Sequence, residues 1–212
     1  MARGRFITLE GGEGAGKSTQ AKRLAAWLVT PSRVAVVTRE PGGSPGAEEI
    51  RRLLVEGAPE RWDPLTETLL HYAARRDHLR RTIAPELERG HWVVCDRFFD
   101  STMAYQGYGQ GVDHEFIRGL ERAVIGELRP DLTLILDLPV ETGLARAAKR
   151  RDHARRYETM DRPFHQRVRD GYLAIAAAEP RRCAVIDAAA DADTVQARIR
   201  ETIRARLAGE FA

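Results

Sequence analysis

A glycine-rich segment near the start of the chain combines residue types that can bind phosphate. The run Gly11-Gly12-Glu13-Gly14-Ala15-Gly16-Lys17-Ser18 fits the pattern G-x-x-x-x-G-K-[ST], and Thr19 follows it. Glycines let a loop fold closely around phosphates with its N–H groups pointing inward. Lys17 would reach the β- and γ-phosphates of ATP, and the Ser18 hydroxyl would bind Mg²⁺. The alternative to this phosphate-binding loop (P-loop) is a plain glycine-rich turn.

A P-loop needs a strand before it and a helix after it, and the sequence predicts both. Residues 6–10 read as a buried strand and residues 17–29 as a helix. Further strands are expected at 34–38, 92–95, 132–136 and 184–186. Further helices are expected between and after them at 47–55, 65–89, 113–128, 140–151 and 192–208, with one more helix that ends near 178. Short apolar strands separated by helices predict an α/β fold, a five-stranded parallel sheet with helices on both faces. We expect one domain, residues 1–212.

The carboxyl ends of the strands are where ligands bind in such sheets. Asp96 ends the third predicted strand and could act on Mg²⁺ directly or through water. A P-loop alone does not distinguish a GTPase, a motor, a transporter or a kinase. The chain contains no asparagine and no lysine with Asp two residues later, so it lacks the [NT]-K-x-D element that reads guanine. The absence of this element argues against a GTP switch of the Ras type.

The overall composition bears on the cellular location of the chain and on the partners that it can bind. The 212 residues are 43% apolar and 31% charged, and no apolar run is long enough to cross a bilayer or act as a signal peptide. We expect a cytoplasmic protein without a membrane partner. A net charge of only +3 argues against general nucleic-acid binding. Cys95 and Cys183 each lie beside apolar residues, which favours two buried thiols over a disulfide or a metal site.

A second motif, at residues 96–107, has the sequence DRFFDSTMAYQG. Together with TREPGG at 38–43, Glu13 within the P-loop, PDLTL at 130–134 and VIDA at 185–188, it resembles bacterial thymidylate kinases along essentially the whole chain. The resemblance implies a P-loop nucleoside monophosphate kinase fold with a mobile lid at about 149–165. It also implies acceptor-site segments at 39–51, 71–75 and 96–107. The implied reaction transfers the γ-phosphoryl group of ATP-Mg to dTMP, giving dTDP and ADP for dTTP synthesis, in a homodimer.

The same resemblance implies roles for individual acceptor-site residues. Arg97 and Arg51 would hold the acceptor 5′-phosphate, although Arg51 could equally be a solvated helix arginine. Glu13 would accept the sugar 3′-hydroxyl, and Tyr105 would lie under C2′ and disfavour a ribose. Arg75 would donate to the thymine O4 carbonyl and reject cytosine. The remaining residues expected at the substrate are Ser101, Thr102 and Gln106, the last two as a polar wall around the base.

One position departs from the family pattern. A phenylalanine usually stacks on the base four residues before the base-reading arginine, and here that residue is His71. Imidazole can also stack on a base. The change could instead alter affinity or base preference, or make the site pH-dependent. In the other interpretation, Tyr72 takes over the stacking role or the segment is shifted.

The arginine-rich stretch is the third feature with a chemical role. Family members whose P-loop lacks an arginine supply the catalytic arginine from the lid, and this P-loop has none. Arg156 matches that position by its distance from Phe164 and Tyr172, but Arg151, Arg150 and Arg155 are also within reach. The alternative is a solvated charged surface. Arg146, on the helix before the lid, is expected to flank the ATP adenine.

Two competing functions remain at this point. A kinase for another acceptor, such as dUMP or a 5-modified deoxypyrimidine nucleotide, would fit the change at His71. A regulatory ATP- or RNA-binding module would fit the arginine-rich stretch, and would bind without turnover and with steep salt dependence.

Overall fold

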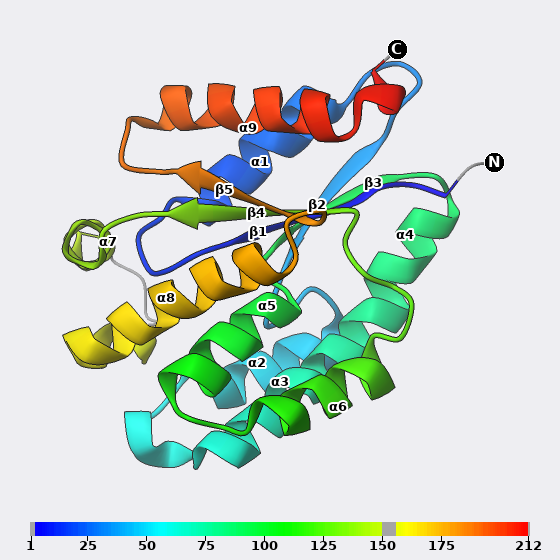
Figure 1. Ribbon diagram of the computed structural model, residues 1–212. Helices are drawn as coiled ribbons and strands as arrows, with labels where there is room; N and C mark the ends of the chain where they lie inside the picture. Colours follow the sequence, from blue (N-terminus) through cyan, green and yellow to red (C-terminus); the bar gives the residue numbers. More distant parts are fainter. Residues whose placement is uncertain (1–2, 150–155, 212) are drawn as a thin grey trace.

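The computed structural model describes residues 3–149 and 156–211 (Figure 1). Its strands are β1 (Phe6–Glu10), β2 (Ala35–Arg39), β3 (Trp92–Asp96), β4 (Leu132–Asp137) and β5 (Cys183–Asp187). The helices are α1 (Lys17–Leu28), α2 (Pro45–Val55), α3 (Pro64–His78), α4 (Ala84–Glu88), α5 (Phe99–Thr102), α6 (His114–Val124), α7 (Val140–Ala148), α8 (Arg162–Ala178) and α9 (Ala192–Arg206). Short 3₁₀ turns occur at Pro59–Arg61, Tyr157–Thr159 and Ala208–Glu210.

The sheet is entirely parallel, with strand order β2-β3-β1-β4-β5. This confirms the predicted α/β fold and its five strands. The strand β1 lies in the middle, so the loop that follows it opens between the ends of β3 and β4. The helices α1 and α9 cover one face, and the larger group that includes α3, α6 and α8 covers the other (Figure 1).

Side chains alternate between two cores on the two faces of the sheet. In β1, Phe6 packs in the core under α3, α6 and α8, whereas Ile7 and Leu9 pack in the core under α1 and α9. This alternation follows from the two-residue repeat of a strand, and burial on both faces explains the nearly continuous apolar sequence of the central strands. Cys95 and Cys183 are both buried and unpaired, as predicted.

The long helix predicted at 65–89 is interrupted. It runs as α3, then as a π-helical segment at Leu79–Ile83, and ends as α4. Pro85 lies in the first turn of α4. A proline has no N–H and its ring collides with the carbonyl four residues earlier, so wider i→i+5 turns before it keep the helix continuous. A second π-helical segment, Met103–Gly109, carries part of the predicted acceptor site.

No helix within 3–149 or 156–211 is both long and apolar enough to cross a bilayer.

Candidate active site

The P-loop connects β1 to α1, as predicted. Gly14 has φ 69°, and a Cβ atom there would come within 2.0 Å of the Gly143 carbonyl oxygen, so only glycine fits. The α1 N-terminus has no side-chain cap, which leaves its N–H groups for a ligand. The Lys17 Nζ donates to the carbonyl oxygens of Gly11 (3.0 Å) and Gly12 (2.7 Å). Burial and the nearby Arg97 lower the pKa of Lys17 to about 8.

Two oxygen donors meet beside the P-loop. The Ser18 hydroxyl, at the start of α1, donates to the Asp96 carboxylate at the end of β3. Hydroxyl and carboxylate oxygens are the donors that Mg²⁺ accepts, and the ion keeps waters and binds substrate phosphates at its other positions. The described residues hold no group of three or more His, Cys, Asp or Glu side chains that could bind a metal unaided. The pair therefore fits a phosphate-bound Mg²⁺ better than an all-protein site.

Arg97 lies at the centre of the site. Its guanidinium donates to Glu13 Oε1 (2.8 Å), the Tyr105 hydroxyl (2.9 Å) and the Gly11 carbonyl (3.2 Å). Its Nη1 also contacts the hydroxyls of Ser101 (3.3 Å) and Tyr172 (3.2 Å). One guanidinium thus contacts the P-loop at Gly11 and the two residues predicted to lie at the sugar, Glu13 and Tyr105.

Arg75 is held rigidly with one donor to spare. Its side chain is buried, its Nε donates to Glu40 Oε2 (2.7 Å), and its Nη2 donates to Phe98 O and Thr102 Oγ1 (both 3.1 Å). The Nη1 atom is buried and has no hydrogen-bond partner in the described part of the chain. An unsatisfied buried donor is costly, so this atom is suited to a ligand acceptor.

One cavity of about 180 Å³ unites most of the predicted residues. It runs from the P-loop to α3, across the carboxyl ends of β1, β2 and β3. The residues along it come from the P-loop, all three predicted acceptor segments, the end of α2 and the lid: Glu13, Lys17, Ser18, Arg39, Glu40, Pro41, Arg51, Val55, His71, Arg75, Asp96, Arg97, Phe98, Ser101, Thr102, Tyr105, Gln106, Tyr157 and Glu158. Arg51 also donates to the Pro41 carbonyl (2.6 Å), so it is not simply a solvated helix arginine.

His71 lines the cavity, whereas Tyr72 does not. The Tyr72 ring is buried in the core with the Arg75 guanidinium 4.7 Å from its centre, so the interpretation in which Tyr72 stacks on the base is wrong. Burial, with the positive charge of Arg75, lowers the pKa of His71 to about 3. The imidazole is therefore neutral at physiological pH, which argues against the alternative in which His71 makes the site pH-dependent.

A lid residue that sequence analysis missed fills the space beside His71. The Tyr157 hydroxyl donates to Glu67 Oε1 (2.7 Å) and lies 3.0 Å from His71 Nε2. Because the Tyr157 proton points to Glu67, the His71 contact requires the tautomer with hydrogen on Nε2. Gln106 Nε2 donates to the same Glu67 oxygen (2.7 Å). The polar wall expected at Gln106 is thus part of a larger buried network around Glu67.

Arg156 lies on the acceptor side of the site. It is buried, with its Nη1 2.5 Å from Glu67 Oε2 and 3.3 Å from the Leu54 carbonyl. It does not line the cavity shared with Lys17. The catalytic role of Arg156 stays a prediction. The other candidates, Arg150, Arg151 and Arg155, lie outside the described residues.

Arg146 lies apart from this cavity. It donates to the carbonyl oxygens of Ala188 (3.0 Å) and Ala189 (2.9 Å), in the loop that follows β5. The side chain therefore joins α7 to this loop on the far side of the P-loop from α3. That location is compatible with the predicted adenine contact.

Comparison with known proteins identifies the family. The model of the family "Thymidylate kinase" matches residues 9–199. The chain belongs to the thymidylate kinase family. It is 57% identical over 207 residues to the thymidylate kinase of Caulobacter vibrioides (98% of this chain, 99% of the relative), and 56% identical over 208 residues to that of Afipia carboxidovorans (97% and 91%). The thymidylate kinase crystal structure from Ehrlichia chaffeensis superposes with a TM-score of 0.78 at 36% identity, covering 95% of this chain and 99% of that one.

Family membership excludes the regulatory or RNA-binding module as the main function. It also confirms the fold type expected from the motif at 96–107. Most charged and aromatic residues that face the cavity were predicted from the sequence, but Tyr157 and the buried acids Glu10, Glu40 and Glu67 were not. The signal for Glu10 was a carboxylate in an otherwise apolar strand, and the signal for Glu67 was a carboxylate on the inner side of a helix. Glu40 lies within the TREPGG motif that follows the second strand.

Proposed function

We propose that this member of the thymidylate kinase family transfers the γ-phosphoryl group of ATP to dTMP in the cavity between the P-loop and α3, giving dTDP and ADP. The observation that carries this proposal is the unpartnered Nη1 of Arg75, in the wall of the same cavity that reaches Lys17 and Ser18. A phosphate-binding end and a base-reading end are thus joined in one space. No covalent intermediate is required, because catalysis of phosphoryl transfer rests on positioning and charge neutralisation.

At the donor end, the P-loop N–H groups and Lys17 hold the ATP phosphates. Lys17 leaves the carbonyls of Gly11 and Gly12 and turns to the phosphates, whose negative charge raises its pKa again. Ser18 and Asp96 would hold Mg²⁺, which would supply charge neutralisation on the transferring phosphoryl group. Arg146 flanks the adenine beside Ala188.

At the acceptor end, Arg97 and Arg51 bind the 5′-phosphate of dTMP. A guanidinium presents paired donors that match phosphate oxygens, and its charge stabilises the transfer state. Glu13 accepts the 3′-hydroxyl, and the Tyr105 ring, held by its hydroxyl contacts to Arg97 and Glu13, lies under C2′. The acceptor phosphate is anionic at neutral pH, so no strong general base is needed.

Arg75 selects the base. Its Nη1 donates to the thymine O4 carbonyl, whereas cytosine would present an amino donor there and leave both groups unsatisfied. Thr102 holds Arg75 Nη2, and Gln106 completes the wall. Uracil carries the same O4 carbonyl, so discrimination between dTMP and dUMP depends on the space at the C5 methyl group.

The decisive experiment measures ADP release with ATP-Mg across dTMP, dUMP, dCMP, UMP, CMP, AMP and GMP. We expect strong preference for dTMP, with dCMP and the ribonucleotides far behind. Preference for another monophosphate would keep the phosphoryl-transfer mechanism but overturn the assignment of the base pocket. His71, which differs from the usual phenylalanine, would then be the first residue to change.

Replacing His71 with phenylalanine is expected to keep or improve the KM for dTMP. Phenylalanine retains a stacking face, and the only hydrogen bond to a described residue that it loses is the one to the Tyr157 hydroxyl, which keeps its partners Glu67 and Gln106. Steady-state kinetics with varied dTMP tests this. A clear loss of affinity would mean that the histidine makes a specific polar contact with the substrate.

Replacing Arg156 with alanine is expected to lower kcat more than it raises the KM for dTMP, if Arg156 leaves Glu67 for the transferring phosphoryl group. Loss of one oriented charge at the transition state corresponds to about 10²-fold or more in kcat. Glu67→Gln is the variant to compare with Arg156→Ala, since it removes the ion pair between Glu67 and Arg156 but keeps the arginine. An unchanged kcat in Arg156→Ala would move the role to Arg150, Arg151 or Arg155.

A homodimer is the proposed assembly. Large apolar side chains are exposed on neighbouring helices: Leu53 on α2, Leu65 and Leu69 on α3, and Phe116 on α6. The helices α2 and α3 pack together, and α3 packs on α6 (Figure 1). Exposed apolar side chains on helices that pack on one another favour a protein interface.

We expect light scattering to give the mass of a dimer for the wild-type protein, and a shift toward the monomer mass for Leu69→Glu. A wild-type monomer would contradict the proposal. The cytoplasmic location stays a prediction.

A further inference from the structure

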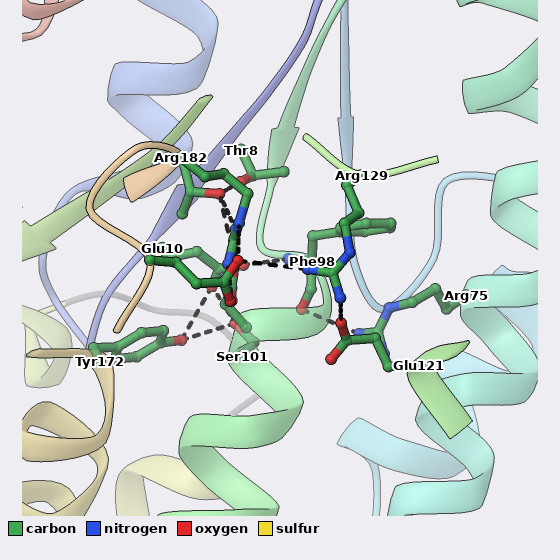
Figure 2. Close-up of polar contacts among 12 residues, drawn as sticks. Thr8, Glu10, Arg75, Phe98, Ser101, Glu121, Arg129, Tyr172 and Arg182 are labelled. Atoms are coloured by element: carbon green, nitrogen blue, oxygen red, sulfur yellow. Dashed lines mark hydrogen bonds and ion pairs between the residues drawn. The ribbon is translucent and has the colours of Figure 1, made fainter. Parts of the chain in front are cut away.

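A carboxyl group is buried directly behind the acceptor arginine. Glu10 is the last residue of β1, immediately before the P-loop, and its side chain is fully buried. It reaches across the end of the sheet to the segment after β3 and to α8. Figure 2 shows its carboxylate surrounded by Phe98, Ser101 and Tyr172. Neither phosphate binding by the P-loop nor base recognition uses this group.

Glu10 holds the backbone on which Arg97 sits. Arg97 has φ 70°, and within the described residues it is the one non-glycine residue with positive φ. A side chain in this left-handed region strains the backbone, so such a conformation needs support from its surroundings. The next N–H, that of Phe98, donates to Glu10 Oε1 at 2.7 Å. A charge-assisted bond of this kind fixes the turn that aims Arg97 at the cavity.

Glu10 also acts on the Arg97 side chain through two hydroxyl groups. The Ser101 hydroxyl donates to Glu10 Oε2 (2.6 Å), and the Tyr172 hydroxyl lies 3.1 Å from the same oxygen and 2.8 Å from Ser101 Oγ, as drawn in Figure 2. With the Ser101 hydrogen on Glu10, the Tyr172 hydroxyl donates to Glu10 directly or to Ser101. A hydroxyl that donates its only hydrogen to a carboxylate has lone pairs left to accept. Both oxygens then accept from Arg97 Nη1, at 3.3 and 3.2 Å. The Glu10 carboxylate thereby fixes the two hydroxyls as acceptors, and Arg97 as the donor, in both contacts.

We propose that Glu10 is a positioning residue for acceptor binding, which holds Arg97 in its strained backbone conformation and orients the Ser101 and Tyr172 hydroxyls so that they accept from its guanidinium. Glu10 itself touches neither nucleotide. The inference rests on the proposed role of Arg97 at the dTMP phosphate. It predicts that changes at Glu10 act on the acceptor and leave ATP binding unaltered.

The ionisation of Glu10 provides a way to test whether its carboxylate makes the Ser101 and Tyr172 hydroxyls accept hydrogen bonds from Arg97. Burial and the charge of Asp100 raise its pKa to about 8, against the opposing effects of Ser101, Arg97 and Phe98 N–H. Once protonated, Glu10 has a donor at one of its two oxygens, in the place where glutamine has its amide nitrogen. Other titratable groups whose charges interact with it are Lys17, Arg75, Cys95, Tyr172 and Cys183. The contrast between glutamate and glutamine should therefore be greatest above the pKa of Glu10.

The test compares Glu10→Gln with wild type at about pH 9 and about pH 7. Glutamine keeps the shape and can still accept from Phe98 N–H, but its amide donates to the hydroxyls and reverses their polarity. We expect the KM for dTMP to rise about tenfold or more at the higher pH, as for the loss of one hydrogen bond to a charged group. The increase should be smaller at the lower pH, and the KM for ATP should not change. Both enzymes retain Lys17, but the Glu10 charge raises the pKa of Lys17, so the KM for ATP is measured at both pH values as the control for Lys17.

A double-mutant cycle with Arg97→Ala separates positioning from general stability. If Glu10 acts through Arg97, adding Glu10→Gln to Arg97→Ala should cause no further loss of acceptor affinity. An additional loss there, or an unchanged or lower dTMP KM in Glu10→Gln alone, would overturn the inference. If Arg97→Ala itself has no effect on dTMP, the proposed acceptor role of Arg97 fails instead.

Two further variants keep the test decisive. Glu121 is another nearly buried carboxylate in the region of Figure 2, and in the described part of the chain it pairs with Arg129 rather than with Arg97. Glu121→Gln is expected to change Tm but not the dTMP KM. If Glu10→Gln does not fold, Ser101→Ala with Tyr172→Phe removes both hydroxyls and leaves Glu10 in place. This double variant should raise the dTMP KM in the same direction; an unchanged value would overturn the inference.

Discussion

Lys17→Ala is expected to reduce kcat by at least ~10²-fold, the scale for loss of one oriented charge at the transition state. Lys17 is buried and already within the P-loop, where it contacts the carbonyls of Gly11 and Gly12. Its ammonium group therefore needs only a small movement to reach bound phosphates. Coupled measurement of ADP release at saturating ATP and dTMP gives the value directly.

Lys22→Ala is the matched control for that result. Lys22 lies on the same helix, α1, but is exposed to solvent. The change removes an identical charge about one and a half turns further along the helix, and we expect unchanged kcat. Near-normal turnover in Lys17→Ala would contradict the proposed function of the P-loop in transfer.

Arg75→Met is expected to weaken dTMP binding and also to destabilise the fold. Methionine fills part of the space but provides no donor. Glu40 is then left buried without its guanidinium partner, although His78 Nδ1 still lies 3.0 Å away. Removing one partner of a buried ion pair costs about 3–5 kcal/mol of unfolding free energy. Denaturant titration measures this loss, and the KM for dTMP measures the loss of the O4 contact.

Combining Arg75→Met with Glu40→Gln separates the two effects. Neutralising Glu40 removes the unpaired buried charge, so much of the lost stability should return. The double variant still lacks the donor to O4, so the KM for dTMP should stay high. Recovery of dTMP affinity together with stability would show that Arg75 serves the fold alone.

Sequence analysis predicted the elements that depend on local pattern. The glycine run, the apolar strands and the periodic helices each contain their own signal, and the five strands were found in nearly the predicted positions. The interruption of the helix at Leu79–Ile83 was missed, although Pro85 was visible in the sequence. A proline marks a probable break, but only packing decides whether the helix stops or continues through wider turns.

The contacts of a side chain were harder to predict from the sequence than its functional role. Arg75 was selected through resemblance, yet its orientation depends on contacts to Glu40, Phe98 and Thr102, which approach from other elements. Tyr157 was not selected, because its contacts to Glu67 and His71 join positions almost ninety residues apart. Long-range contacts of this kind leave no periodic trace in one sequence. The location of Arg156 beside Glu67 is of the same type.

The position of β1 between β3 and β4 divides recognition into two independent halves. The residues that face the acceptor follow β1, β2 and β3, whereas Arg146 and the loop at Ala188 lie beyond β4, next to β5. In the proposed arrangement, the two nucleosides would therefore extend from the P-loop in opposite directions and share only the phosphates at its centre. Substitutions that change the choice of acceptor base can accumulate around α3 without disturbing the donor. The same scaffold could thus acquire a new acceptor while remaining an ATP-dependent enzyme.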